Sequence, residues 1–265
     1  MSLPVPPRPD VDVGAPAASP RATWGPLEAI GVWLVAYVVI GGAVVFPILA
    51  ASMDIDIDDA TGGADSDVLF LSAAIALVST AVLLLWLRTR HPTWPRVMGL
   101  VGPGVLSDAR WGAAAGLALY PIVALGVGTI VVVVLEALAG DSVATPEQLD
   151  AGLDVGGKVL AVVYGVGIAP FAEELFFRGV LFRALADRRG FWVGAIVSGL
   201  LFGIVHVPTG QQDVADTLVL PIVMTFTGIG LAWIYERRRS LLAPIAAHIV
   251  FNAIGLALIF SGVGG

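Results

Sequence analysis

The sequence has no cysteine, a single lysine, and charged residues at only 13% of its 265 positions. The absence of cysteine excludes disulfide bonds and thiol chemistry. Soluble domains have about a quarter of their residues charged, whereas here 57% are hydrophobic and the mean hydropathy is +0.91. We therefore expect an integral membrane protein whose partners are membrane lipids, with no nucleic-acid partner. The sequence also has no dinucleotide-binding or phosphate-loop motif and no internal repeat of fixed period.

Several apolar stretches are long enough to cross a bilayer, which takes about 20 mostly apolar residues. We count seven, of which the fifth is short: residues 27–51, 68–87, 111–139, 156–182, 192–207, 217–235 and 241–260. Backbone inside lipid must satisfy its own hydrogen bonds, so these spans are expected to be helices. The predicted fold class is an all-α, polytopic transmembrane helical bundle of about seven spans.

The chain divides into four predicted parts. The segment 1–23 is rich in proline and alanine and has no apolar periodicity, so we expect a disordered tail. Residues 24–155 hold the first three spans, residues 156–260 form the core that carries the polar groups discussed below, and residues 261–265 are a short C-terminal tail.

Basic and acidic connections alternate along the chain. Arginines cluster in 88–110, 183–189 and 236–240, whereas 54–67, 140–154 and 211–216 are acidic. Basic loops lie on the cytoplasmic side of membrane proteins, so the N-terminus is predicted to be cytoplasmic. With a composition typical of a GC-rich bacterial genome, we expect the bacterial cytoplasmic (plasma) membrane, with a site reachable from the cytoplasm. Trp94 and Trp111 beside the arginines of 88–110 suggest a short interfacial helix.

Few ionisable or amide side chains fall inside the spans, and such residues mark functional sites in membrane proteins. They come from the fourth, fifth and seventh spans: Glu173, Glu174, Arg178, His206, His248 and Asn252. The third histidine, His91, lies in the polar loop RTRHPTWP and is expected to be solvated.

Helical spacing predicts which of these side chains share a face. Glu174 and Arg178 are four residues apart, so they are expected to form an ion pair, whereas Glu173 points about 100° away from Glu174. His248 and Asn252 also share a face. His206 lies on the same face as Phe202 and the pair Gly199 and Gly203, so this face should pack closely against a neighbouring helix.

Histidines, carboxylates, an arginine and an amide suit hydrolysis, by one of two mechanisms. In the first, His206, His248 and a glutamate such as Glu173 bind Zn²⁺ with an open position for water. In the second, Glu173 and His206 activate water without a metal, and His248 and Asn252 donate to the oxyanion. The spacing alone does not choose between them, because the H-E-x-x-H of soluble zinc proteases is absent.

Three motifs carry a resemblance to a known family. The segments EELFFR, FGIVH and HIVFN match, in order, the E-E-x-x-x-R, F-x-x-x-H and H-x-x-x-N motifs of the CPBP family. These are intramembrane CAAX-processing and bacteriocin-processing proteases, also called the Abi family. The resemblance covers about residues 156–260 and implies an intramembrane endopeptidase, described in the family as a metalloprotease. It implies that Glu173 activates water beside His206, and that His248 and Asn252 stabilise the oxyanion.

A membrane-associated peptide or protein is the substrate that the resemblance implies for a bacterial chain. Some relatives act in self-immunity or as scaffolds, so a non-catalytic protein built on the same polar cluster is the alternative. A transporter is a weaker idea, since no internal repeat supports it.

Overall fold

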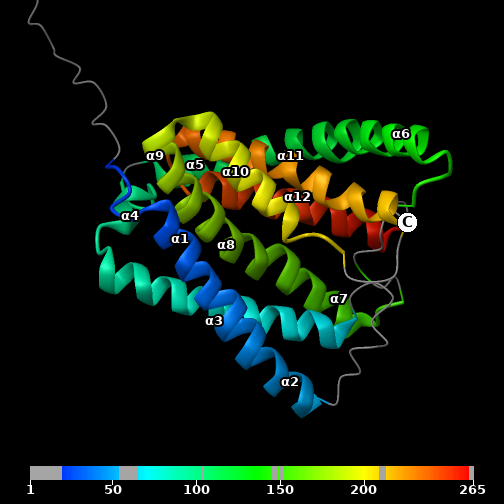
Figure 1. Cartoon of the computed structure of the whole chain (residues 1–265), viewed down its shortest axis with the longest axis horizontal. Coiled ribbons are helices and arrows are strands. Elements are labelled where there is room, and N and C mark those ends of the chain that lie inside the picture. Colours follow the sequence, from blue (N-terminus) through cyan, green and yellow to red (C-terminus); the bar gives the residue numbers. More distant parts are fainter. Residues whose placement is uncertain are drawn as a thin grey trace, which may run out of the picture.

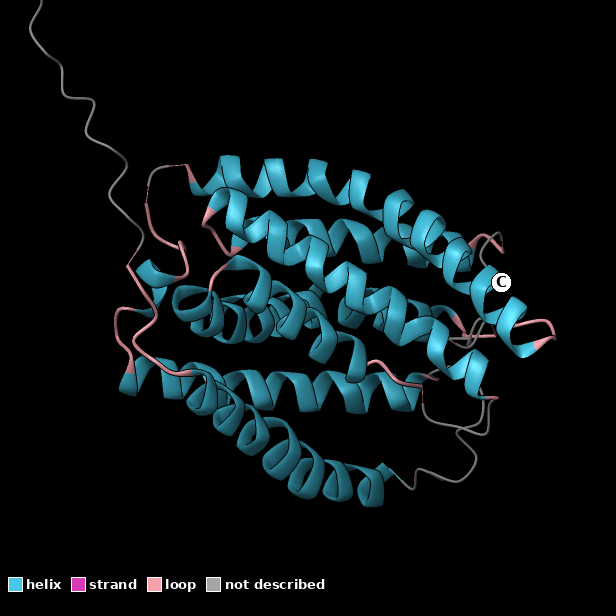
Figure 2. Ribbon diagram, turned by 45° about the horizontal axis from the view of Figure 1, so that its top comes forward, coloured by secondary structure: helices cyan, strands magenta, loops and turns pink. Residues whose placement is uncertain are grey.

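A computed structural model describes residues 20–53, 65–102, 104–144, 149, 152–208 and 213–262. The elements form a bundle of roughly aligned long helices (Figures 1 and 2), and no β-strand occurs among the described residues. The predicted all-α, polytopic bundle is confirmed. Residues 1–19 of the predicted N-terminal tail and residues 263–265 of the predicted C-terminal tail lie outside the described residues.

Six continuous helices among the described residues are long and apolar enough to cross a membrane. Several consist of α-helical and π-helical (η) segments that follow one another without a break. In chain order the six are Pro26–Met53 (α1 Pro26–Trp33, η1 Leu34–Val45, α2 Phe46–Met53), α3 Ser66–Arg90, Val105–Ala139 (α5 Val105–Tyr120, η3 Pro121–Val127, α6 Gly128–Ala139), Val155–Arg189 (α7 Val155–Val162, η4 Val163–Ile168, α8 Ala169–Glu174, η5 Leu175–Phe182, α9 Arg183–Arg189), α11 Val214–Arg238 and α12 Leu242–Phe260.

The predicted fifth span is α10, Phe191–Ile204, which has 14 residues and is shorter than a bilayer-crossing helix. The helices before and after α10 are longer than the sequence predicts. The helix Val155–Arg189 continues through the basic segment 183–189, which was expected to be a loop. A short helix, α4 Trp94–Val97, confirms the helix expected within 88–110. The number of spans and the orientation in the membrane stay predictions.

Glycines allow two pairs of helices to approach closely. A Cβ on Gly112 or Gly116 of α5 would lie 2.1 or 2.4 Å from the carbonyl oxygen of Ala243 or Ala247 in α12. A Cβ on Gly203 of α10 would lie 2.2 Å from Thr225 Oγ1 in α11, and one on Gly199 would lie 2.8 Å from Ile229 Cγ1. The predicted packing of the glycine face of α10 against a neighbouring helix is confirmed, and that helix is α11.

Residues 20–24 are held against the bundle, contrary to the prediction of a free tail through residue 23. Arg183 Nη2 donates to Pro20 O at 2.7 Å, and Ala22 N donates to Asp187 Oδ2 at 2.8 Å. Trp24 is fully buried, and its Nε1 donates to Val180 O at 2.9 Å. The proline-rich composition of this segment gave no sign of these partners, which all belong to the distant helix Val155–Arg189.

The expectation for His91 is wrong, because this side chain is buried at 8% exposure. Its ring lies 4.7 Å from that of Trp86 and 5.3 Å from that of Trp24. Its nitrogens contact Thr23 Oγ1 at 2.9 Å and Glu28 Oε1 at 3.0 Å. The polar loop sequence suggested solvation, but Trp86 at the end of α3 and the distant Trp24 cover the imidazole.

Candidate active site

The buried half of the helix Val155–Arg189 carries an ion pair. Glu174 and Arg178 are both fully buried, and Arg178 Nη1 donates to Glu174 Oε1 at 2.7 Å, which confirms the predicted pair. Arg178 Nη2 also donates to Gly228 O of α11 at 3.2 Å. Two buried charges are tolerated only when they are paired and hydrogen-bonded, so this pair fixes the helix Val155–Arg189 against α11.

His248 of α12 connects the ion pair to Glu173. Its Nδ1 lies 2.9 Å from Glu174 Oε1, and its Nε2 lies 3.8 Å from Glu173 Oε2. An ionised carboxylate only accepts hydrogen bonds, so Nδ1 carries the proton. In the neutral ring Nε2 therefore presents a lone pair, and only the imidazolium form has a proton to offer toward Glu173.

Glu173 differs from Glu174 in its access to the surroundings. The Glu173 side chain is 24% exposed, whereas that of Glu174 is 0% exposed. This follows from the helical spacing, which turns neighbouring residues about 100° apart. Glu173 is therefore the carboxylate that water or a substrate can reach, and Glu174 holds Arg178 and His248.

His206 follows the last turn of α10, and its tautomer is also set by its surroundings. Its Nδ1 lies 2.6 Å from the carbonyl oxygen of Phe202, which can only accept, so Nδ1–H donates and Nε2 is the free nitrogen. Both histidines of the predicted site thus have Nδ1 bound to the protein and Nε2 unprotonated when neutral.

The ring of Phe202 joins these groups. It is fully buried, and its centroid lies 4.6 Å from the His206 ring, 5.8 Å from the His248 ring and 5.0 Å from the Phe177 ring. The Arg178 guanidinium carbon lies 4.5 Å from the same centroid, within cation–π range. Phe202 thereby brings residues of α10, α12 and Val155–Arg189 into one cluster.

Asn252 is placed one turn after His248, but its amide binds main chain. Its Nδ2 donates to Gly165 O at 2.7 Å. Gly165 lies in the π-helical segment η4, which precedes the segment α8 that ends with the glutamates. The helix continues through this region, and Asn252 ties it to α12.

The ligand set predicted for Zn²⁺ is only partly assembled. Both Nε2 atoms are available as ligands, and each Nδ1–H is held by an acceptor, as is usual for metal-binding histidines. However, among the described residues no three His, Asp or Glu side chains lie together in a group that could hold a metal ion. The tautomers fit a metal site, and the placement of the three side chains does not.

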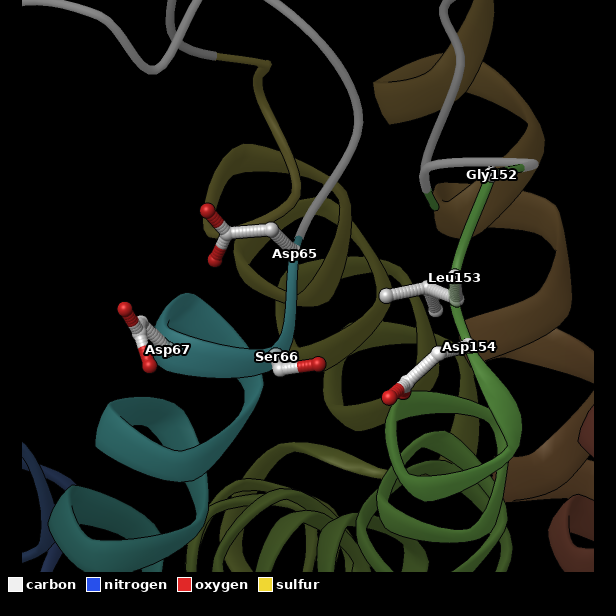
Figure 3. Close-up of a pocket in the computed structure, with 6 residues that line it drawn as sticks. All are labelled: Asp65, Ser66, Asp67, Gly152, Leu153 and Asp154. Atoms are coloured by element: carbon white, nitrogen blue, oxygen red, sulfur yellow. The ribbon is translucent and has the colours of Figure 1, made fainter.

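An acidic cavity lies elsewhere, between the N-terminal ends of α3 and α7 (Figure 3). It is lined by Asp65, Ser66, Asp67, Gly152, Leu153 and Asp154. Asp65 Oδ1 accepts from Val68 N at 2.9 Å, and Asp154 Oδ1 accepts from Gly157 N at 2.7 Å, so both side chains cap helices. None of the motif residues lines this cavity.

Residues 156–254 match the family model of the type II CAAX prenyl endopeptidase Rce1-like proteins. This segment of the chain is similar to the Rce1-like proteins. It includes all six predicted site residues and Phe202, so the resemblance recognised from the three motifs is confirmed over these residues.

Two curated proteins are similar to part of this chain. "Putative membrane peptidase YdiL" of Bacillus subtilis (strain 168) is 33% identical over 107 residues, which are 40% of this chain and 40% of that protein. The UPF0177 protein YxdF of Lactococcus lactis subsp. lactis (strain IL1403) is 29% identical over 111 residues, which are 40% of this chain and 56% of that protein. The alignments thus cover less than two thirds of the length of either relative. No solved structure matches the chain significantly.

Sequence reasoning missed two acceptors of the site, the carbonyls of Gly165 and Gly228, because a backbone oxygen carries no signal in a side-chain pattern. It recognised Phe202 as a motif position and as a residue on the His206 face. Its contacts with His248 and Arg178 depend on how three helices pack.

Proposed function

We propose that the protein is an intramembrane endopeptidase that hydrolyses a peptide bond of a membrane-associated peptide or protein. One observation carries this proposal: Glu173 is partly exposed and faces His248 Nε2 at 3.8 Å, while the neighbouring Glu174 is buried and neutralised by Arg178. Such a division between one accessible and one structural carboxylate suits general-base catalysis. The Rce1-like match over 156–254 and the peptidase name of the Bacillus relative support the same reaction class.

In the proposed reaction, the Glu173 carboxylate accepts a proton from a water molecule. The water oxygen forms a bond to the carbonyl carbon, and the carbonyl oxygen becomes an oxyanion. The C–N bond then breaks, and the proton held by Glu173 passes to the leaving amine. His206 Nε2, which is free of hydrogen, is a second acceptor for the attacking water. Glu174 and Arg178 act as positioning residues that hold His248 in one tautomer.

His248 and Asn252 are the proposed oxyanion partners in this mechanism. His248 can donate from Nε2 only as an imidazolium, because its Nδ1–H is already bound by the Glu174 carboxylate. Asn252 uses one amide hydrogen for Gly165 O and keeps the other. The proposed steps use only side chains of the protein, because among the residues that the structure describes no three candidate ligands form a group that could hold a metal ion.

The first experiment compares peptide cleavage by the protein reconstituted in lipid bilayers, wild type against Glu173→Gln. The substitution keeps the shape but removes the base, so we expect cleavage to fall by about 10²–10⁴-fold. Glu136→Gln is the matched control, because Glu136 lies at the far end of another apolar helix, and it should cleave like wild type. Equal cleavage by wild type and Glu173→Gln would refute the proposed base.

A chelator separates the two forms of hydrolysis that the sequence left open. The glutamate mechanism predicts that incubation with 1,10-phenanthroline leaves the rate unchanged and that purified protein has no stoichiometric zinc. Loss of activity with recovery on adding Zn²⁺ would instead support the zinc mechanism, with His206, His248 and Glu173 as the proposed ligands.

A non-catalytic immunity or scaffold protein is the second candidate function. The buried network favours it, because Arg178 and His248 connect three helices and would stabilise the bundle even without catalysis. In that case wild-type protein yields no peptide product, whereas Glu174→Ala and His248→Ala lower thermal stability.

We further propose that the protein resides in a bacterial plasma membrane and that its site is reached from the cytoplasmic side. The support is that basic α4, α9 and the α11–α12 connection all lie at one end of the bundle (Figure 1), as the positive-inside rule requires for a cytoplasmic face. Labelling of single cysteines placed at Arg188 and at Ser142 in intact cells would test this orientation.

A further inference from the structure

Donors for the oxyanion are scarce in the cluster described above. His206 and His248 both use Nδ1–H within the protein, and neither Nε2 has a proton in the neutral rings. Arg178 is fully buried beneath Phe202 and Glu174. Acyl-transfer catalysts generally need preorganised donors where negative charge develops, so the proposed reaction needs further N–H or O–H groups near Glu173.

Stacked aromatic rings of two neighbouring helices put Tyr37 at the same level as Glu173. Trp33 stacks on Phe176 at 5.6 Å with an interplanar angle of 25°, and on Tyr37 at 5.7 Å with an angle of 23°. The helices Pro26–Met53 and Val155–Arg189 run in opposite directions (Figure 1). One turn forward from Trp33 is Tyr37, and one turn back from Phe176 is Glu173, so both steps lead to the same level.

Electrostatics agree with this placement. The Tyr37 phenol lies within electrostatic reach of the Glu173 carboxylate. The Tyr164 phenol also lies within reach of Glu173 and of Tyr37. Tyr164 directly precedes Gly165, whose carbonyl binds Asn252. Two phenols and the proposed base therefore share one region of the bundle.

Helix α3 places a hydroxyl side chain next to each of the two phenols. The Thr80 hydroxyl lies beside Tyr37, and the Ser72 hydroxyl lies beside Tyr164. Ser79 Oγ donates to Ala36 O at 2.9 Å, which fixes α3 against η1 next to Tyr37.

We propose that Tyr37 and Tyr164 donate their phenolic O–H groups to the carbonyl oxygen of the scissile peptide as it becomes an oxyanion. This inference rests on the proposed endopeptidase function and adds to it two donors that lie on the Glu173 side of the site. Tyr37 belongs to the first helix, outside the Rce1-like segment 156–254. The N-terminal helices would then contribute directly to catalysis and not only to membrane anchoring.

The test compares kcat and KM of the bilayer-reconstituted protein for wild type, Tyr37→Phe and Tyr164→Phe. Each substitution removes only a hydroxyl, so we expect kcat to fall by about 10²–10³-fold, the cost of one oxyanion donor, with KM unchanged. Tyr120→Phe is the matched control: Tyr120 packs on Phe251 at 5.0 Å and has no electrostatic contact with Glu173, so its kcat should equal that of wild type.

A second measurement separates catalysis from folding. A phosphonamidate peptide, which imitates the tetrahedral oxyanion, should bind Tyr37→Phe more weakly than wild type by the same factor as the loss in kcat, while substrate affinity stays constant. The inference is overturned if wild type cleaves and both phenylalanine variants keep its kcat, or if their losses follow a lower melting temperature. Failure of the proposed function itself is recognised separately, because wild type then cleaves no faster than Glu173→Gln.

Discussion

Two helices of this protein have the same length and opposite surroundings. Val105–Ala139 and Val155–Arg189 both have 35 residues. The most apolar stretch of 18 residues has a mean hydropathy of 2.6 in the first helix and 1.6 in the second. Of this stretch, 17% is buried inside the protein in the first helix and 39% in the second. The more apolar helix is the more exposed one, which is the reverse of the pattern in a water-soluble protein.

The comparison shows where a membrane protein places its polar groups. In Val105–Ala139, Asp108, Arg110 and Glu136 lie near the ends, where water and headgroups are accessible. In Val155–Arg189, Glu174 and Arg178 lie in the middle of the helix and are fully buried. Charges within the bilayer are costly unless they are paired within the protein, so burial follows from their position along the helix.

The largest expected difference between the two helices concerns an arginine. Arg178→Met leaves Glu174 buried without its partner, and we expect the free energy of unfolding to fall by about 3–5 kcal/mol. Arg110→Met, at an exposed position of the other helix, should change it by less than about 0.5 kcal/mol. Unfolding in mixed micelles measures both values, and similar losses would contradict the assignment of Arg178 to a buried pair.

The helix Val105–Ala139 also has a buried face, formed by glycines of α5, and a substitution on that face should be destabilising. Gly116→Ala should destabilise the protein by about 1–3 kcal/mol, because the new Cβ would lie 2.4 Å from Ala247 O and force α5 and α12 apart. In the same continuous helix, the Cβ of Gly126→Ala would lie 3.7 Å from Pro121 O, so this variant should be neutral or slightly stabilised. Melting temperatures of the two variants in one detergent check this.

The two helices should also differ in how the loss of a carboxylate charge affects kcat. Glu174→Gln keeps an acceptor near His248 but removes the charge that holds its tautomer and balances Arg178, so we expect kcat to fall by about 10–100-fold. Glu136→Gln in the other helix should not change kcat. A Glu174→Gln variant with wild-type kcat would show that His248 does not need this orientation.

The smallest effect is expected at the pair His91–Glu28, which lies outside both helices. Glu28 Oε1 is 3.0 Å from His91 Nε2, but its side chain is 40% exposed. Partly exposed ion pairs contribute up to about 1 kcal/mol, so Glu28→Gln should lower the unfolding free energy by no more than that. A larger loss would mean that the buried imidazole depends on this carboxylate for the docking of residues 20–24.

The sequence predicted the helical bundle well, and the reasons are local. Long apolar stretches predicted all six long helices, because a bilayer-crossing segment needs only length and hydropathy. Spacing of four residues predicted the Glu174–Arg178 pair, since these side chains meet on one helix face. The predictions for His91 and residues 20–23 were wrong, because Trp24, which covers His91, and Arg183, which binds Pro20, come from distant segments.

By itself the sequence determined that this is a membrane-embedded helical protein, which residues within its helices are polar, and the order of its three motifs. Hydropathy and helical period act along the chain, so both can be read without coordinates. Only the tertiary structure decided which nitrogen of each histidine is free, that Phe202 joins the motifs, and that Tyr37 stands at the level of Glu173. These features depend on contacts between helices, which are set by side-chain packing across the bundle and have no fixed spacing in the sequence.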